Sequence, residues 1–297
     1  MEDNRVKYEI KNSKNKKSKS KKPAGKASKV RRIAEDIIMG CLVIIMLFSA
    51  WKIYTIVKDY KSNQDAYDKI SAQSRDGEFT GDIDFDALRK INPDVVGWIY
   101  YKDTIIDDPI VKGTDNDKYL YTMFDGQYGG FGTLFVDAVT EHPFKQFNTI
   151  VYGHHMRNGS MFAPLKKLKD RKYCEEHPRM ELITPEGKFH LDIVAFLNQP
   201  ADSNIYTTNI GEIKAREVYL DTVNNLADYT TDVPVKPTDR LVILSTCAYE
   251  YQDARYMVVG KMIPWEGENI DMSYDAEEAP AYGDAEAEAD GETGAEG

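Results

Sequence analysis

One long apolar run dominates the hydrophobic pattern near the N-terminus. Residues 37–57 contain 21 residues with a single charge, Lys52, close to one end. About 20 apolar residues in a helix span the hydrocarbon core of a bilayer. Lys52 can extend to the interface along its aliphatic stem, and Trp51 and Tyr54 are typical of an interfacial aromatic belt. The run therefore predicts a transmembrane helix.

Two other interpretations of this run are weaker. A cleaved signal peptide usually has a short basic region and a cleavage site with small residues. Here the preceding basic region is 32 residues long, and no good cleavage site follows. A buried helix of a soluble domain is disfavoured because the run is too long and too uniformly apolar. We therefore expect an uncleaved anchor.

After the anchor, the pattern changes to short apolar runs separated by Gly, Pro, Asn and Asp. A short helix is predicted over 84–90 and ends at Ile91-Asn92-Pro93. Eight runs rich in Val, Ile, Tyr and Phe then follow, which is typical of a β-barrel or a β-sandwich. They are residues 95–101, 107–113, 132–138, 148–154, 180–187, 189–197, 239–247 and 255–263. Two interruptions, 161–172 and 213–229, are predicted to be helical.

Charge divides the chain into parts with different properties. The net charge is −11, but residues 1–32 carry thirteen Lys or Arg and three Asp or Glu. Lys and Arg stay on the cytoplasmic side of a membrane. The segment 1–36 is therefore predicted to be cytoplasmic, and the chain after residue 58 is predicted to be exported. A basic segment can also bind nucleic acid, but beside a membrane helix it indicates topology and attraction to anionic lipid.

The exported part is predicted to contain a linker or N-terminal helix over 58–83 and one folded domain over 84–265. The last segment, 266–297, holds twelve Asp or Glu and no Lys or Arg. Such a composition cannot bury enough apolar surface to fold. We therefore expect this acidic tail to be disordered.

The three cysteines lie in different settings. Cys41 is inside the apolar run, and Cys174 precedes Glu175 and Glu176, whose carboxylates disfavour a thiolate. Cys247 ends an apolar run, where a strand can hold its side chain rigidly at a loop. A disulfide between Cys174 and Cys247 is an alternative in an exported protein.

Arg255 and two histidines can supply the groups that a cysteine nucleophile needs. If the last two runs pair as a hairpin, Cys247 and Arg255 lie side by side. The guanidinium then favours a thiolate and can stabilise an oxyanion. His154 and His155 follow another run, as a proton donor for the cysteine would. From these residues alone a structural role stays the commoner interpretation, and no Cys-x-x-Cys or His-x-x-x-His spacing indicates a metal site.

Several short segments form an ordered set along the chain: 91–99, 107–111, 115–120, 132–137, 152–154, 159–162 and 244–247, followed by Arg255. Taken in this order, they resemble the class B sortases, which are membrane-anchored cysteine transpeptidases of Gram-positive bacteria. Two positions depart from the family pattern. Ile243 stands where the family often has Thr, and Ala248 stands where some relatives carry an acidic residue.

The resemblance implies a mainly β fold, a closed eight-stranded barrel with added helices, of which 213–229 is the helix that marks class B. It implies that Cys247 attacks the sorting motif, that His154 rather than His155 transfers the proton, and that Arg255 supports the oxyanion. It implies no cofactor and no metal. The residues it places in the substrate groove are Asn116, Leu120, Tyr152, Ser245 and Thr246.

The resemblance also implies the partners. These are secreted proteins with a C-terminal sorting motif similar to NPxTN or SPxTG, and an amine of peptidoglycan or of its lipid-linked precursor. The expected location is the cell membrane, in a single pass with an extracellular catalytic domain and no nucleic-acid partner. Three alternatives stay open: a sortase that polymerises pilins, a cysteine peptidase that uses water, and a silent membrane-anchored binding module.

Overall fold

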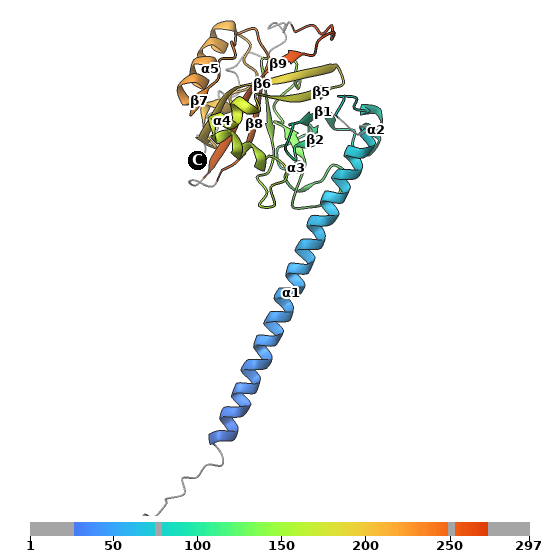
Figure 1. Cartoon of the computed structure of the whole chain (residues 1–297), viewed down its shortest axis with the longest axis vertical. Helices are drawn as coiled ribbons and strands as arrows, with labels where there is room; N and C mark the ends of the chain where they lie inside the picture. Colours follow the sequence, from blue (N-terminus) through green and yellow to red (C-terminus); the bar gives the residue numbers. More distant parts are fainter. Residues whose placement is uncertain (1–26, 75–78, 249–252, 273–297) are drawn as a thin grey trace, which may run out of the picture. The chain divides into compact units, whose positions relative to one another are not determined.

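The computed structural model describes residues 27–74, 79–248 and 253–272. The chain divides into two compact units, Met1–Lys58 and Asp59–Gly297, and the second unit contains a nine-stranded sheet (Figure 1). The strands are β1 Val95–Tyr100, β2 Asp107–Val111, β3 Leu134–Val136, β4 Asn148–Tyr152, β5 Arg179–Thr184, β6 Gly187–Pro200, β7 Tyr229–Thr230, β8 Leu241–Cys247 and β9 Ala254–Pro264.

Eight of these strands form a closed barrel. The order is β5-β1-β2-β3-β4-β8-β9-β6, and β5 also pairs with β6, which closes the ring. The pairings β2·β3 and β4·β8 are parallel, and the other pairings around the ring are antiparallel. The predicted eight-stranded barrel is confirmed. The ninth strand, β7, pairs with β6 outside the ring.

The barrel encloses one buried apolar cluster and carries two more on its outer surface. Every strand of the ring contributes to the interior cluster, because side chains point alternately into and out of a barrel. Examples are Ile99, Ile110, Leu134, Val151, Leu182, Leu191, Val242, Leu244 and Val258. One outer cluster lies under helix α5 (Ile213–Leu226) and includes Ile243 and Met257. The other lies under helix α2 (Phe85–Ile91) and includes Trp98.

The helices match the prediction in place but differ at their ends. Asp84 caps α2 by accepting a hydrogen bond from the Ala87 amide at 2.9 Å. The predicted helix over 161–172 is two elements, the 3₁₀ helix η1 (Ala163–Lys169) and α4 (Arg171–Glu176). They are divided at Asp170, which caps α4. The predicted helix over 213–229 ends at Leu226, because Tyr229 and Thr230 pair with β6.

The folded domain extends beyond both predicted boundaries. The ring of Phe79 stacks on that of Tyr100 at 4.1 Å, before the predicted start at residue 84. After residue 265, Ile270 and Met272 pack against the interior cluster, and Arg240 donates to the Asp271 carbonyl at 2.8 Å. The first part of the predicted acidic tail is therefore packed on the barrel. The remainder, 273–297, lies outside the described residues.

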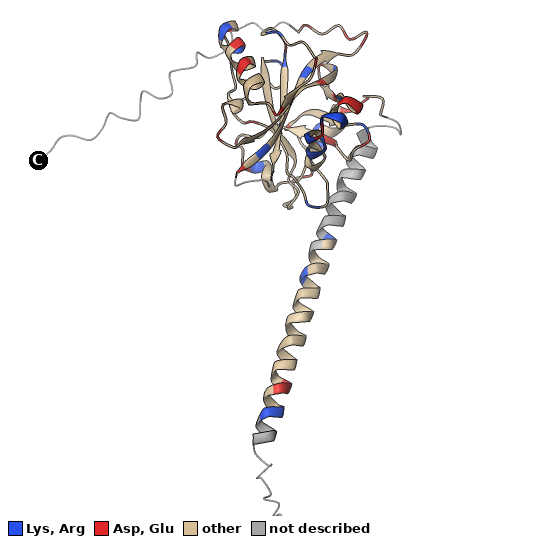
Figure 2. Ribbon diagram, turned by 60° about the vertical axis from the view of Figure 1, so that its left-hand side comes forward, with Lys and Arg blue, Asp and Glu red and all other residues tan. Residues whose placement is uncertain are grey.

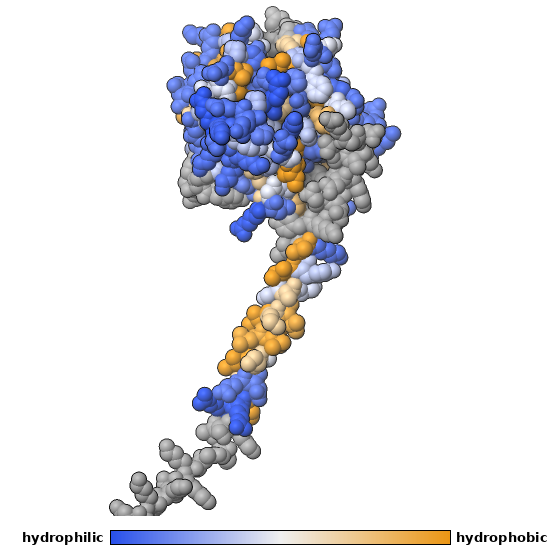
Figure 3. Space-filling view, viewed as in Figure 1, coloured by the Kyte–Doolittle hydropathy of each residue, from blue (hydrophilic) through white to orange (hydrophobic). Residues whose placement is uncertain are grey.

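The apolar run near the N-terminus lies in helix α1 (Ala27–Ser74). Within it, Arg31–Thr55 is long and apolar enough to cross a membrane, and its most apolar window is not buried at all. Figure 3 shows a hydrophobic band within this stretch, and Figure 2 shows charged residues on both sides of that band. The helix therefore has the length and exposure that the predicted anchor over 37–57 requires.

Close packing inside the barrel predicts a stability effect at Gly260 in β9. A Cβ atom at this position would lie 2.4 Å from Cγ of Leu191. We expect Gly260→Ala to lower the free energy of unfolding by about 1–3 kcal/mol through overpacking, measured by urea denaturation. Gly130→Ala is the control, because a Cβ there would meet nothing within 4 Å. Equal midpoints for the two variants would contradict this account of the core.

Candidate active site

The ends of three neighbouring strands bring the predicted catalytic residues to one end of the barrel. In the parallel pair β4·β8, Tyr152 lies opposite Ser245, and the Gly153 amide donates to the Ser245 carbonyl at 3.0 Å. In the antiparallel pair β8·β9, Cys247 lies directly opposite Arg255. The predicted hairpin is therefore confirmed, and His154 follows the strand next to Cys247.

Alternation along β8 and β9 determines which side chains share a face. Ile243 belongs to the outer cluster under α5, so Ser245 and Cys247, two and four residues later, are on the same outer face. Met257 is also in that cluster, so Arg255 shares this face with Cys247. Directly opposed residues on one face have Cβ atoms about 4.5–5.5 Å apart. The side chains of Cys247 and Arg255 therefore leave the sheet side by side on this face, where Nη1 of Arg255 donates to the Ala254 carbonyl at 3.0 Å.

Thr246 is on the opposite face of β8. Its side chain is 2% exposed and follows Leu244 of the interior cluster by two residues. Its hydroxyl has no hydrogen-bond partner among the described residues. Thr246 is predicted from the sequence to line the substrate groove, but its side chain points into the barrel, because strand alternation sends every second residue inward.

The two adjacent histidines make different contacts. Nε2 of His154 lies 2.7 Å from the Leu120 carbonyl oxygen, and Nδ1 of His155 lies 2.7 Å from the Cys247 carbonyl oxygen. A carbonyl only accepts, so each ring nitrogen is the donor. The His155 ring is thereby tied to the backbone of the nucleophile's strand. The His154 ring is tied in the same way to the Leu120 carbonyl, so the preference for His154 rests on its place directly after Gly153 in the segment that resembles the family.

Cys247 is partly exposed, whereas Cys174 is 2% exposed, and both are free thiols. The alternative of a disulfide between them is therefore wrong. Burial raises the pKa of the Cys174 thiol, and the Glu175 carboxylate adds to the effect. Cys174 is thus an inert structural cysteine, chiefly because it is buried rather than because of its acidic neighbours.

The rings of Tyr152 and Tyr206 form an aromatic wall beside Cys247 and Arg255. The hydroxyl of Tyr152 donates to Asp137 at 2.7 Å, and the Tyr206 hydroxyl bonds to the Ser245 hydroxyl at 2.7 Å. The two tyrosine rings stack with centroids 6.0 Å apart. Burial raises the pKa of Tyr206 to about 12, although the bond to Ser245 and the charge of Arg255 act in the opposite direction. Tyr206 therefore keeps its proton at neutral pH.

Sequence analysis missed Tyr206. It lies in the short 3₁₀ helix η2 (Asn204–Tyr206), within the long connection from β6 to β7. No periodic pattern marks residues 201–212, where Tyr206 lies, and no motif points to them. The one available signal was an aromatic residue in a loop, which is too common to single out a site.

The other two predicted groove residues lie on the connection from β2 to β3. Leu120 is in helix α3 (Lys118–Tyr121), is half-buried, and provides the carbonyl that holds His154. The side-chain oxygen of Asn116 accepts from the Ala138 amide at 2.8 Å, which ties this connection to the turn after β3. The structure therefore brings Leu120 to the site. Asn116 instead stabilises the connection that carries Leu120 by binding the turn after β3.

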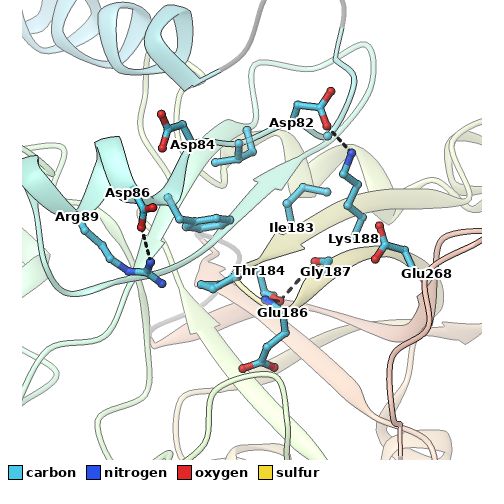
Figure 4. Close-up of a pocket in the computed structure, with 14 residues that line it drawn as sticks. Asp82, Asp84, Asp86, Arg89, Ile183, Thr184, Glu186, Gly187, Lys188 and Glu268 are labelled. Carbon is cyan, nitrogen blue, oxygen red and sulfur yellow. Dashed lines mark hydrogen bonds and ion pairs between the residues drawn. The ribbon is translucent and has the colours of Figure 1, made fainter.

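A separate cavity of about 630 Å³ lies between the segment before α2 and the hairpin β5–β6 (Figure 4). Both basic residues that line it are in ion pairs with lining carboxylates: Lys188 with Asp82 at 2.6 Å, and Arg89 with Asp86 at 3.1 Å. None of the predicted site residues lines it. Among the described residues, no cluster of His, Cys, Asp and Glu could hold a metal ion. The groups that can carry chemistry are therefore at the other site.

Comparisons with known proteins agree with this arrangement. The model of the sortase domain matches residues 101–263. The chain is 33% identical to sortase B of Listeria monocytogenes over 227 residues, which covers 74% of this chain and 92% of that protein. A structure of the Staphylococcus aureus sortase B–substrate complex is similar with a TM-score of 0.63, 28% identity, and coverage of 70% of this chain and 99% of that one. A structure of Clostridium perfringens sortase B is similar with a TM-score of 0.57 and 32% identity, and the match covers 61% of this chain and 100% of that one.

The exposure of the two thiols in the barrel domain predicts selective alkylation. In a Cys41→Ser background, a thiol reagent should modify Cys247 in the folded protein and Cys174 only after denaturation. The reason is that Cys174 is buried and its thiol pKa is raised, whereas Cys247 is accessible beside Arg255. Peptide mapping by mass spectrometry measures both sites. Modification of the two cysteines at equal rates in the folded protein would contradict the assignment.

Proposed function

Since this chain belongs to the sortase family and is a class B sortase, a cysteine transpeptidase, we propose that Cys247, His154 and Arg255 carry out its reaction. The observation that carries the proposal is the register of β8 and β9, which sets Cys247 opposite Arg255. The second support is the parallel pairing of β4 with β8, which delivers His154 to the same end.

The proposed reaction has two steps. The Cys247 thiolate attacks the carbonyl carbon of the scissile peptide bond, and the guanidinium of Arg255 stabilises the oxyanion that develops. His154 gives its proton to the leaving amine, and a thioester remains on Cys247. An incoming amine then attacks the thioester, gives a proton to His154, and releases the thiolate.

The substrate groove is proposed to lie along the outer face beside these residues. Tyr152, Ser245 and Tyr206 form a hydrogen-bonded and stacked wall next to the thiol, and Leu120 is at its edge. Such a wall can position an extended peptide through backbone and apolar contacts. The similar Staphylococcus aureus structure is a complex of sortase B with substrate. The proposed donors are secreted proteins with a C-terminal sorting motif similar to NPxTN or SPxTG.

The proposed acceptor is an amine of peptidoglycan or of its lipid-linked precursor. Both that amine and the sorting motif lie outside the membrane, so the catalytic domain must be there too. The apolar stretch Arg31–Thr55 supports a single membrane span. The thirteen Lys or Arg in residues 1–32 support a cytoplasmic N-terminus.

Peptide turnover tests the catalytic assignment. We expect the protein in detergent to cleave a quenched fluorescent peptide with an NPxTN, SPxTG or LPxTG core and to join it to an added amine. Cys247→Ala should abolish turnover, and Arg255→Ala should lower kcat by about 10²–10³-fold through loss of oxyanion stabilisation. Arg255→Lys is the matched control, because lysine keeps the positive charge but lacks the planar guanidinium group.

The products distinguish the alternatives. Cleavage without a joined product would indicate a hydrolytic peptidase, and joining only to a lysine side chain of a protein would indicate pilin polymerisation. Full turnover by Cys247→Ala would contradict the proposed nucleophile. Each product is identified by its mass, so hydrolysis and transfer are measured in the same reaction.

The membrane orientation has its own test. In spheroplasts of a Gram-positive host, protease added outside should digest the domain at 79–272, whereas a tag placed before residue 27 should stay intact. The basic N-terminal segment is the reason, because Lys and Arg resist translocation. Immunoblots of the tag and of the domain measure the outcome. Protection of the domain in intact spheroplasts would overturn the proposed topology.

A further inference from the structure

We propose that the backbone carbonyl of Leu120 fixes the His154 ring with its proton on Nε2, so that Nδ1 is the nitrogen that gives and takes the catalytic proton. Gly132 is the positioning residue that permits this contact. The inference rests on the proposed catalytic role of His154 and goes further, because it assigns the two ring nitrogens to different tasks.

The contact itself determines which nitrogen is held. Nε2 of His154 is 2.7 Å from the Leu120 oxygen, a short hydrogen bond. A carbonyl oxygen has no proton to donate, so Nε2 keeps its hydrogen in both the neutral and the charged imidazole. The centroid of the Tyr121 ring lies 6.1 Å from that of the His154 ring. Two neighbouring residues of α3 therefore lie beside the histidine, and the carbonyl of one of them holds Nε2.

This assignment leaves Nδ1 to react. In the charged ring, Nδ1–H passes its proton to the amine that leaves as the scissile C–N bond breaks. In the resulting neutral ring, the Nδ1 lone pair accepts the proton of the amine that attacks the thioester.

Gly132, whose backbone packs closely against the carbonyl oxygens of α3, explains why the Leu120 carbonyl can lie so close to His154. Gly132 has φ +60°, and a Cβ atom there would lie 2.6 Å from the Leu120 oxygen and 2.4 Å from the Tyr119 oxygen. The Thr133 amide donates to the Tyr119 carbonyl at 3.0 Å and fixes this close approach. Any side chain at position 132 must therefore displace the carbonyls of α3, including the one that holds His154.

Two glycine variants separate this effect from backbone strain. Gly126 has φ +82°, but a Cβ there would meet nothing within 4 Å. Gly132→Ala and Gly126→Ala both place alanine in the left-handed region, and only the first pushes on the Leu120 carbonyl. We expect Gly132→Ala to lower kcat for the sorting peptide by about 10–100-fold, as misplaced catalytic groups do. KM should change little, and Gly126→Ala should stay near the parent protein.

A spectroscopic measurement tests the assignment without relying on turnover. The full chain with Cys247→Ala, labelled with ¹⁵N-histidine in detergent micelles, should show the His154 neutral ring as the Nε2–H tautomer. Adding Gly132→Ala should weaken that preference, and adding Gly126→Ala should not. A proton on Nδ1 of neutral His154, or identical kcat and tautomer populations in the two glycine variants, would overturn the proposal.

Failure of this inference differs from failure of the proposed function. If His154→Ala keeps full transpeptidation, the catalytic role of His154 is wrong, whatever its tautomer. If His154→Ala is inactive but the tautomer is Nδ1–H, only the present inference fails. Should Gly132→Ala not fold, the tautomer of the Cys247→Ala protein alone still decides between the two nitrogens.

Discussion

The parallel pairing of β4 with β8 is the constraint on which the active site depends. These strands are about 90 residues apart in the chain, and their pairing sets Tyr152 opposite Ser245. Because β8 continues for two further residues, the chain after β4 turns beside Cys247. The antiparallel hairpin then adds Arg255 on the other side of Cys247. A shift of one residue in either register would move a side chain to the opposite face and separate the groups.

The closed barrel makes this register rigid. Each of the eight strands has two neighbours, so no strand can slide without breaking two ladders. The interior cluster and the cluster under α5 hold β8 from both faces. The reactive residues are placed at the end of this rigid element, where they are partly exposed. A substrate can reach the thiol there, while the strands that carry Cys247 and Arg255 stay fixed.

Local patterns explain why so much of this arrangement was predictable. The eight strands are short apolar runs between turn residues, and seven residues separate Cys247 from Arg255 at the ends of two such runs, so a hairpin was the natural expectation. Barrel and sandwich could not be separated by pattern alone, since closure depends on the long-range pair β5·β1. The family resemblance favoured the barrel over the sandwich, and the observed strand order confirms the barrel.

The features that sequence analysis missed depend on tertiary contacts. Tyr206 reaches Ser245 only because the connection after β6 folds back across the strand ends. Thr246 belongs to a motif beside the nucleophile, yet strand alternation turns it inward. Ile270 and Met272 lie in an acidic segment that composition describes as unfolded, but the barrel offers them an apolar surface. For Tyr206, Ile270 and Met272 the packing partner is far away in the chain.

The central claim is that Cys247 forms a thioester with the donor peptide and that an amine resolves it. Intact-mass spectrometry of the protein mixed with a sorting peptide, before any amine is added, tests this most directly. The account predicts an adduct equal to the N-terminal part of the peptide less one water, located on Cys247, which disappears as the joined product forms on addition of an amine. Turnover with no adduct on Cys247, or an adduct that persists in Cys247→Ala, would contradict it.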